Sequence, residues 1–276
     1  MREPSEVWSA HARQWSLLGP PLRPCAEDVQ AVRDQVAAWQ SEVERPAPRA
    51  LLLGVTPELA ALPWPEGTSL VAADRSDVML EQIFPRAGIP KESNTLCADW
   101  RDLPLPDGCV DVAVGDGCLS VFTFPAEVQA FARSLRRVLA PAGRLVVRIF
   151  AAPPERESLE AVARDLAAGE IGNFHYLKWR VAMALQPSPE RGVVLSDVYA
   201  ACERLAPLLS GLAARQGFEP EVVATIEAYR GSSVRYTFPT VAQLREALSG
   251  IFAVQELAPK SYELGDRCPT LLLRPT

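Results

Sequence analysis

The sequence predicts an open, doubly wound α/β domain. Short, continuous apolar runs bounded by turn formers alternate along the chain with helical patterns. Such runs are typical of parallel strands buried on both faces. Right-handed crossovers between them place helices on both sides of the sheet. With 276 residues and 48% hydrophobic content, the chain can bury one large core.

The predicted strands lie, in chain order, at residues 51–54, 69–74, 94–99, 110–116 and 143–150. Apolar residues at helical spacing predict the intervening helices at residues 56–62, 76–84 and 125–140. Pro141 cannot continue the last helix, and we expect Gly143 to take a left-handed turn into the final strand. A helix at 240–248 then precedes two strands, at 252–259 and 269–275, whose short connection permits only antiparallel pairing.

Two helical regions flank this core. Residues 1–45 predict an N-terminal helical cap, with Trp8, Trp15 and Trp39 on apolar faces. Residues 151–212 carry long helical patterns with no strand between them, so we expect a helical insertion that could form a lid. The core would then comprise residues 46–150 and 213–276, within one integrated domain.

Composition excludes several classes of function. A formal charge of −6 disfavours nucleic acid and anionic membranes as partners. The start MREPSEVWSAHARQW has no apolar signal core, and no apolar run could span a bilayer, so we expect a cytoplasmic protein. The cysteines form no CxxC pair and only two histidines occur, so we expect buried thiols and no metal site. Abundant alanine, arginine and proline suggest a GC-rich bacterial genome.

Ligands of open sheets bind at the carboxyl ends of the strands. After the first strand, Gly54 lets a ligand approach the backbone, and Thr56, Pro57 and Glu58 are typical of a capped helix start. The second strand ends at Asp74, at the spacing where a carboxylate accepts hydrogen bonds from ribose hydroxyls. A well-capped helix alone would also explain the first of these two patterns.

The third and fourth predicted strands also end in polar groups. Asp99 and Trp100 offer an acceptor for an exocyclic amine beside a face on which a base can stack. Gly115 and Gly117 bracket Asp116 and open the backbone to a ligand. A packing tryptophan and a tight turn are the simpler explanations, but coincidence at all four strand ends favours a nucleoside ligand.

Residues 50–150 resemble the core of the class I S-adenosylmethionine-dependent methyltransferases. The segment LPLPDGCVDVAVGDGCL (103–119) is similar to the family's LPxxDxxFD pattern, with Val110 in the Phe position. The segment LRRVLAPAGRLVVRIF (135–150) is similar to LxRVLKPGGxLxxxxP, with Ala142 for the first glycine. The resemblance implies a Rossmann-like, doubly wound sheet of seven mixed strands with the last strand antiparallel.

The first glycine-rich motif departs from the family pattern. Set against VLDLGCGTG, the segment ALLLGVTPE keeps Gly54 but has Leu52 for the acid, Thr56 for the second glycine and Glu58 for the third. The ammonium group of the cofactor then needs another acceptor. Thr56 Oγ or a carbonyl near Gly54 could provide it, and Asp116 could contribute charge. We expect the loop to open a helix with capped-helix geometry.

The resemblance implies that S-adenosyl-L-methionine is the cofactor and that a methyl group passes to a small or medium organic acceptor. The cofactor-binding residues that it implies are Gly54, Val55, Thr56, Asp74, Arg75, Ser76, Met79, Asp99, Trp100, Asp116 and Gly117. A non-catalytic protein that uses the same fold for binding or regulation stays an alternative. A nicotinamide dehydrogenase is disfavoured, because GxGxxG is missing.

The insertion offers candidate catalytic residues within NFHYLKW (173–179). On a helix, His175 and Trp179 share one face, with Tyr176 beside them. We expect this group to line the acceptor pocket, where His175 or Tyr176 would orient the nucleophile or take its proton. Amphipathic packing is the alternative. An apolar lid helix could also serve as a homodimer surface.

Overall fold

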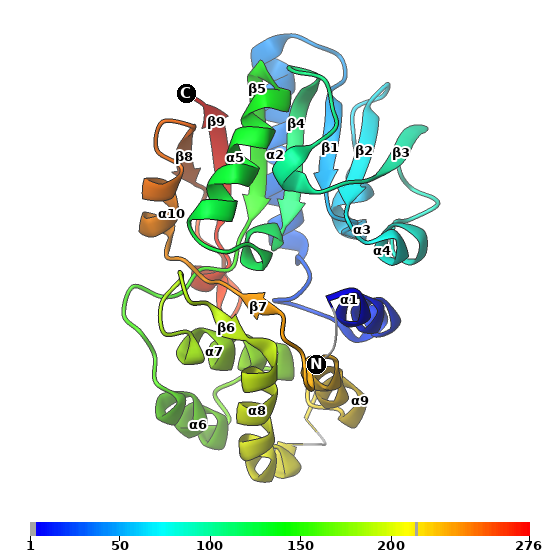
Figure 1. Cartoon of the computed structure of the whole chain (residues 1–276). Coiled ribbons are helices and arrows are strands. Elements are labelled where there is room, and N and C mark those ends of the chain that lie inside the picture. Colours follow the sequence, from blue (N-terminus) through cyan, green and yellow to red (C-terminus); the bar gives the residue numbers. More distant parts are fainter. Residues whose placement is uncertain (1–3, 213–214) are drawn as a thin grey trace.

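The fold is built on one twisted sheet with the strand order β3-β2-β1-β4-β5-β9-β8 (Figure 1). The computed structural model describes residues 4–212 and 215–276. The parallel strands are β1 (Arg49–Leu53), β2 (Ser69–Asp74), β3 (Glu92–Cys97), β4 (Val110–Asp116) and β5 (Leu139–Arg148). β9 (Thr270–Pro275) runs antiparallel between β5 and β8 (Phe252–Glu256). The predicted seven-stranded mixed sheet with an antiparallel last strand is therefore confirmed.

Helices cover both faces of the sheet because alternate strand residues point to opposite sides. On one face, Leu52 packs in an apolar layer with α2 (Ala26–Val43), α3 (Pro57–Ala60) and α4 (Asp77–Gln82). On the other face, Leu51 and Leu53 pack with α5 (Ala126–Val138) and α10 (Val241–Ala247). Leu52 is fully buried, so the residue at the family's acidic position belongs to the core.

A separate helical layer lies beyond the carboxyl edge of the sheet (Figure 1). It comprises α6 (Leu159–Ala168), α7 (Phe174–Leu185), α8 (Leu195–Leu209) and α9 (Pro220–Val223). Its apolar core also takes in residues between Phe218 and Phe238, so this layer extends past residue 212. The insertion was expected to hold no strand, but β6 (Val193–Val194) pairs with β7 (Arg235–Tyr236). No helix in the described ranges is long and apolar enough to cross a membrane.

The N-terminal region divides between the two layers. Helix α2 packs on the sheet against β4, β5 and β9, whereas α1 (Pro4–Arg13) contacts α4 and the 3-10 helix η5 (Ala224–Tyr229). The short 3-10 helix η1 (Trp15–Leu17) follows α1. Figure 1 shows α1 beside the junction of the sheet and the helical layer. The beginning of the chain is therefore placed where it can close a site at the strand ends.

Two local expectations are wrong. Helix α5 ends at Val138 and β5 begins at once at Leu139, so the chain forms an irregularity against β4 instead of a left-handed turn at Gly143.

The cysteines are also less buried than expected. Only Cys118, Cys202 and Cys268 are buried thiols. Cys97 is exposed because it lies on β3, an edge strand with one neighbour.

A buried ion pair fixes the carboxyl ends of the two central strands. Arg148 at the end of β5 donates from Nε to Asp116 Oδ1 (2.5 Å) and from Nη2 to Asp116 Oδ2 (3.0 Å). The two side chains are 2% and 5% exposed. Asp28 of α2 lies 3.7 Å from Arg148 Nη1 and accepts a hydrogen bond from the Tyr262 hydroxyl at 3.0 Å. The cluster thus joins the sheet, α2 and the C-terminal loop.

We expect Arg148→Met to lower the free energy of unfolding by about 3–5 kcal/mol, because Asp116 would stay buried without its counterion. Arg144→Met is the matched control. Arg144 is equally buried, but its partner Glu42 is 51% exposed and can be solvated when the arginine is lost. Urea denaturation of both variants measures the difference. Equal losses would show that arginine packing, and not the buried pair, stabilises this edge.

Helix α7 carries a second buried charge. Lys178 is 1% exposed, and its Nζ donates to Thr225 Oγ1 at 2.9 Å. The ammonium also lies 5.5 Å and 5.6 Å from the ring centres of Phe174 and Tyr229. The structure gives Lys178 no carboxylate partner within the described ranges. Burial lowers the pKa of Lys178 to about 7.

This lysine makes stability depend on pH in a predictable direction. Between the folded pKa of about 7 and the unfolded value of 10.5, only the unfolded state binds the proton, so stability rises with pH. The rise is at most about 1.4 kcal/mol per pH unit. We expect Lys178→Met to raise the free energy of unfolding below pH 7 and to remove this rise. Chemical denaturation across the window, with exposed Lys91→Met as control, measures both effects. Parallel curves for wild type and Lys178→Met would contradict this account.

Candidate active site

A cavity of about 360 Å³ opens at the carboxyl ends of β1, β2 and β4. This volume lies in the range of small-molecule sites. The predicted cofactor residues that line it are Gly54, Val55, Thr56, Asp74, Arg75, Met79, Asp99, Trp100, Asp116 and Gly117. Ser76 is not in the wall, because its hydroxyl caps α4 by accepting from the Met79 N–H at 3.4 Å. The sheet therefore gathers the strand ends into one site.

Gly54 keeps a narrow space open at the centre of this edge. Its φ of 94° lies in the left-handed region, and an added Cβ would lie 3.9 Å from both Asp74 Oδ2 and Trp100 Cζ2. The Trp100 indole is fixed by donating from Nε1 to the Ala73 carbonyl at 2.6 Å. A carboxylate and an indole ring thus both approach a residue without a side chain, an arrangement that fits a ribose and a flat base.

Asp74 differs from the other acids of the cavity wall. Asp99, Asp116 and Glu127 are each in an ion pair with an arginine, whereas no ion pair involves Asp74 within the described residues. Asp74 Oδ1 accepts the Ser76 N–H at 2.8 Å. Burial raises the pKa of the Asp74 carboxyl, although hydrogen bonds and Arg75 oppose the shift. This carboxylate is therefore the one with free acceptor capacity.

Asp99 caps the 3-10 helix η2 (Trp100–Asp102) and is already engaged. Its Oδ1 accepts the Arg101 N–H and Arg101 Nε, both at 2.9 Å, and its Oδ2 also accepts from the Arg101 guanidinium. These hydrogen bonds lower the pKa of Asp99. An exocyclic amine, the ligand group expected at Asp99, would have to share these oxygens with Arg101.

The end of β4 provides less free charge and less open backbone than expected. The negative charge of Asp116 is neutralised by Arg148, so it is not free for a ligand ammonium. Gly117 makes room for a side chain, because an added Cβ would lie 2.6 Å from a ring carbon of Phe150. Gly115 packs against Leu53 and Cys118. Packing accounts for both glycines of this turn, and Gly117 also lines the cavity.

Thr56 has a side-chain hydroxyl that makes no capping hydrogen bond in the first loop. It is 7% exposed, lines the cavity and takes the N-cap position as expected. Pro57 starts the short helix α3, and the Thr56 carbonyl accepts the Leu59 and Ala60 N–H groups at 3.1 and 3.0 Å. The Thr56 hydroxyl is left available for a ligand.

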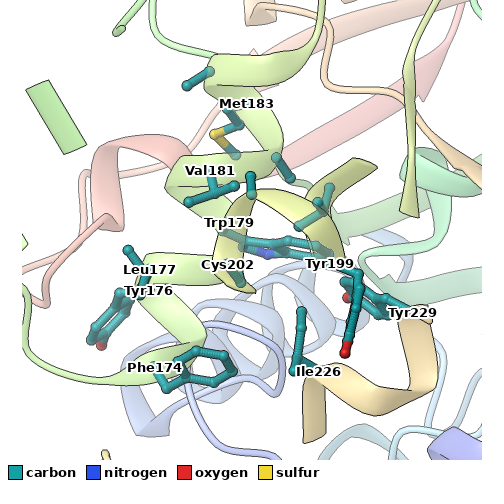
Figure 2. Close-up of a cluster of buried hydrophobic side chains, with 14 of the residues drawn as sticks. Phe174, Tyr176, Leu177, Trp179, Val181, Met183, Tyr199, Cys202, Ile226 and Tyr229 are labelled. Atoms are coloured by element: carbon teal, nitrogen blue, oxygen red, sulfur yellow. The ribbon is translucent and has the colours of Figure 1, made fainter. Parts of the chain in front are cut away.

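The expected acceptor residues of α7 lie elsewhere. His175 is buried, with Nε2 2.9 Å from the Leu17 carbonyl, and its pKa is lowered to about 3 by burial and by Lys178. Figure 2 shows Tyr176 and Trp179 projecting from α7 in different directions. Trp179 lines the cavity, but His175 and Tyr176 do not. The prediction that these two line the acceptor pocket is wrong, because α7 is packed on all sides.

Aromatic side chains that the sequence analysis did not place at the site complete the cavity wall. They are Trp8, His11, Trp15, Phe150, Tyr229 and Tyr236, together with Phe122. The aromatic faces of Trp8 and Trp15 were visible in the sequence as apolar positions. Their role depends on α1 and η1 lying across the strand ends, which is a tertiary arrangement.

Comparison with known proteins supports the family resemblance. Residues 52–147 match the family model described as "Methyltransferase domain". An uncharacterized 37.1 kDa protein in transposon TN4556 of Streptomyces fradiae is 35% identical over 136 residues, which cover 48% of this chain and only 37% of that protein.

Two solved structures are similar in fold. One comes from Rhodobacter sphaeroides and is assigned provisionally to the Zn-dependent alcohol dehydrogenases. It has 12% sequence identity and a TM-score of 0.55, and the alignment covers 97% of this chain and 98% of that chain. The other is the PH0226 protein of Pyrococcus horikoshii OT3, with 13% identity, a TM-score of 0.50, and 95% and 99% covered. At such low identity, both show the fold alone.

In the part of the chain that the structure describes, no cluster of His, Cys, Asp or Glu could hold a metal ion. The sheet order, the cavity at the strand ends and the matched segment agree with one another. The match of residues 52–147 indicates that this part of the chain is similar to a methyltransferase domain.

Proposed function

We propose that this protein transfers the methyl group of S-adenosylmethionine to a small organic acceptor. One observation carries the proposal: a single cavity joins a polar half at the strand ends to an aromatic half built by α1, η1, α7 and η5. Donor and acceptor would occupy adjoining parts of one cavity. Proximity and orientation of this kind are the main contributions that a protein can make to such a transfer.

The polar half is suited to hold the cofactor. Asp74 would accept hydrogen bonds from the ribose hydroxyls, and Trp100 would stack on the adenine. Thr56 Oγ1 and backbone groups near Gly54 would hold the methionine end. When bound, S-adenosylmethionine supplies a methyl group made electrophilic by its sulfonium. The buried rings of the aromatic half would orient the acceptor and keep water from the reacting atoms.

Binding and turnover test the proposal separately. We expect calorimetry to show binding of S-adenosylmethionine and S-adenosylhomocysteine, and none of NAD, because GxGxxG is missing. Donor labelled on the methyl group should pass its label to a low-mass product when small-molecule fractions of cell extracts are added. Binding without transfer to any fraction would favour the non-catalytic alternative, and binding of NAD alone would contradict the proposal.

We expect Asp74→Ala to weaken S-adenosylhomocysteine binding by at least about tenfold, because hydrogen bonds to a charged acceptor contribute about 1.5–3 kcal/mol each. The variant should remain folded, since burial already disfavours the ionised Asp74 carboxyl. Asp77→Ala, on the exposed side of the neighbouring helix α4, is the matched control. Calorimetry with thermal denaturation measures both properties. Unchanged affinity in folded Asp74→Ala would remove Asp74 from the site.

A further inference from the structure

The aromatic half of the cavity has a defined shape. We call it the acceptor chamber and define it by Trp8, His11, Phe150, Trp179, Tyr229 and Tyr236, all of which line the cavity. Trp179 meets Phe150 at 4.9 Å and Tyr236 at 5.6 Å between ring centres, with interplanar angles of 66° and 78°. His11 meets Tyr229 at 6.0 Å and 77°. These edge-to-face contacts hold the rings in fixed orientations and present flat faces to a ligand.

The chamber also contains polar atoms without protein partners. Tyr229 is 1% exposed and Tyr236 is 6% exposed, yet neither hydroxyl makes a hydrogen bond to any residue that the structure describes. His11 Nε2 is a buried nitrogen without a hydrogen-bond partner. Three polar groups within one aromatic chamber therefore retain hydrogen-bonding capacity.

Cationic side chains are absent from the described wall of the chamber. Arg75 and Arg101 line the cavity at the strand ends. Lys178 does not line the cavity; its Nζ lies 5.6 Å from the ring centre of Tyr229 and donates to Thr225 Oγ1. Burial, with a smaller effect of Lys178, lowers the pKa of His11 to about 4, so this imidazole is neutral near pH 7. An anion bound here would lose its hydration without gaining a counterion from the chamber wall.

We propose that the acceptor chamber binds a neutral, planar aromatic or heteroaromatic molecule that carries a hydroxyl or N–H group, with the Tyr229 and Tyr236 hydroxyls as its hydrogen-bonding partners. This inference rests on the proposed function, because it identifies the chemical class of the methyl acceptor. The flat aromatic walls select the ring system, and the unpartnered hydroxyls fix the polar substituent that faces them.

A matched set of probes tests the chemical class on protein saturated with S-adenosylhomocysteine. The probes are 2-naphthol, its saturated and non-planar analogue decahydro-2-naphthol, the anion 2-naphthoate, and naphthalene, which lacks a polar group. Calorimetry measures each dissociation constant. We expect 2-naphthol to bind at least about tenfold more tightly than the saturated alcohol, which loses the ring contacts, and than the anion, which finds no counterion.

Hydroxyl deletions test the named partners. We expect Tyr229→Phe and Tyr236→Phe each to weaken 2-naphthol binding by about threefold to tenfold, since each removes one hydrogen bond while keeping the ring. Binding of naphthalene should not change. Tyr199→Phe is the control, because the Tyr199 hydroxyl lies 3.4 Å from Glu227 and does not line the cavity.

The outcomes separate this inference from the proposed function. Equal binding of 2-naphthol and decahydro-2-naphthol would overturn the inference, because the chamber would then select only by size. Tightest binding of 2-naphthoate would also overturn it and would point to Lys178. In both cases, binding of S-adenosylhomocysteine leaves the proposed function standing. Failure of S-adenosylhomocysteine to bind would overturn the proposed function and this inference together.

Discussion

The buried pair of Asp116 and Arg148 holds together the edge of the molecule at which the cavity forms. Through Asp28 and Tyr262, it joins the ends of β4 and β5 to α2 and to the C-terminal loop. Beside this pair, Gly117 has no side chain and so leaves room for the ring of Phe150, which forms part of the aromatic wall. Asp116 thus lines the polar half of the cavity, while the Arg148 guanidinium lies 5.2 Å from the ring centre of Phe150 in the acceptor chamber.

This arrangement explains how the chain departs at the first motif from the methyltransferase pattern that it resembles. Leu52 fills the core beneath α2, Glu58 is paired with Arg23, and Asp116 is paired with Arg148. At these positions of the first and fourth strand ends, an acid is therefore either absent or paired with an arginine. Affinity for the cofactor would depend mainly on the nucleoside half, where Asp74 retains an unpaired carboxylate beside the open backbone of Gly54. Under the proposed function, the electrostatic contribution to cofactor binding would therefore come from Asp74 at the end of β2.

Sequence reasoning predicted the sheet and the strand-end residues well, because buried parallel strands are short apolar runs and their ends meet at one edge. The runs at 69–74 and 110–116 became β2 and β4 without change of bounds. Sequence reasoning failed for side chains whose positions depend on packing between distant segments. Helical spacing placed His175 beside Trp179 but could not show that η1 would cover the imidazole. Likewise, no local pattern indicated that α1 would bring Trp8 and His11 to the cavity.

A crystal structure of the protein with S-adenosylhomocysteine tests the central claim most directly, namely that donor and acceptor share one divided cavity. We expect the adenosine to lie between Gly54, Asp74 and Trp100, with the ribose hydroxyls bound to the Asp74 carboxylate. The sulfur should face the rings of Phe150 and Trp179. The acceptor chamber should stay free of the cofactor. Adenosine bound among Trp8, Tyr229 and Tyr236, or a ribose without contact to Asp74, would contradict the division of the cavity on which the account depends.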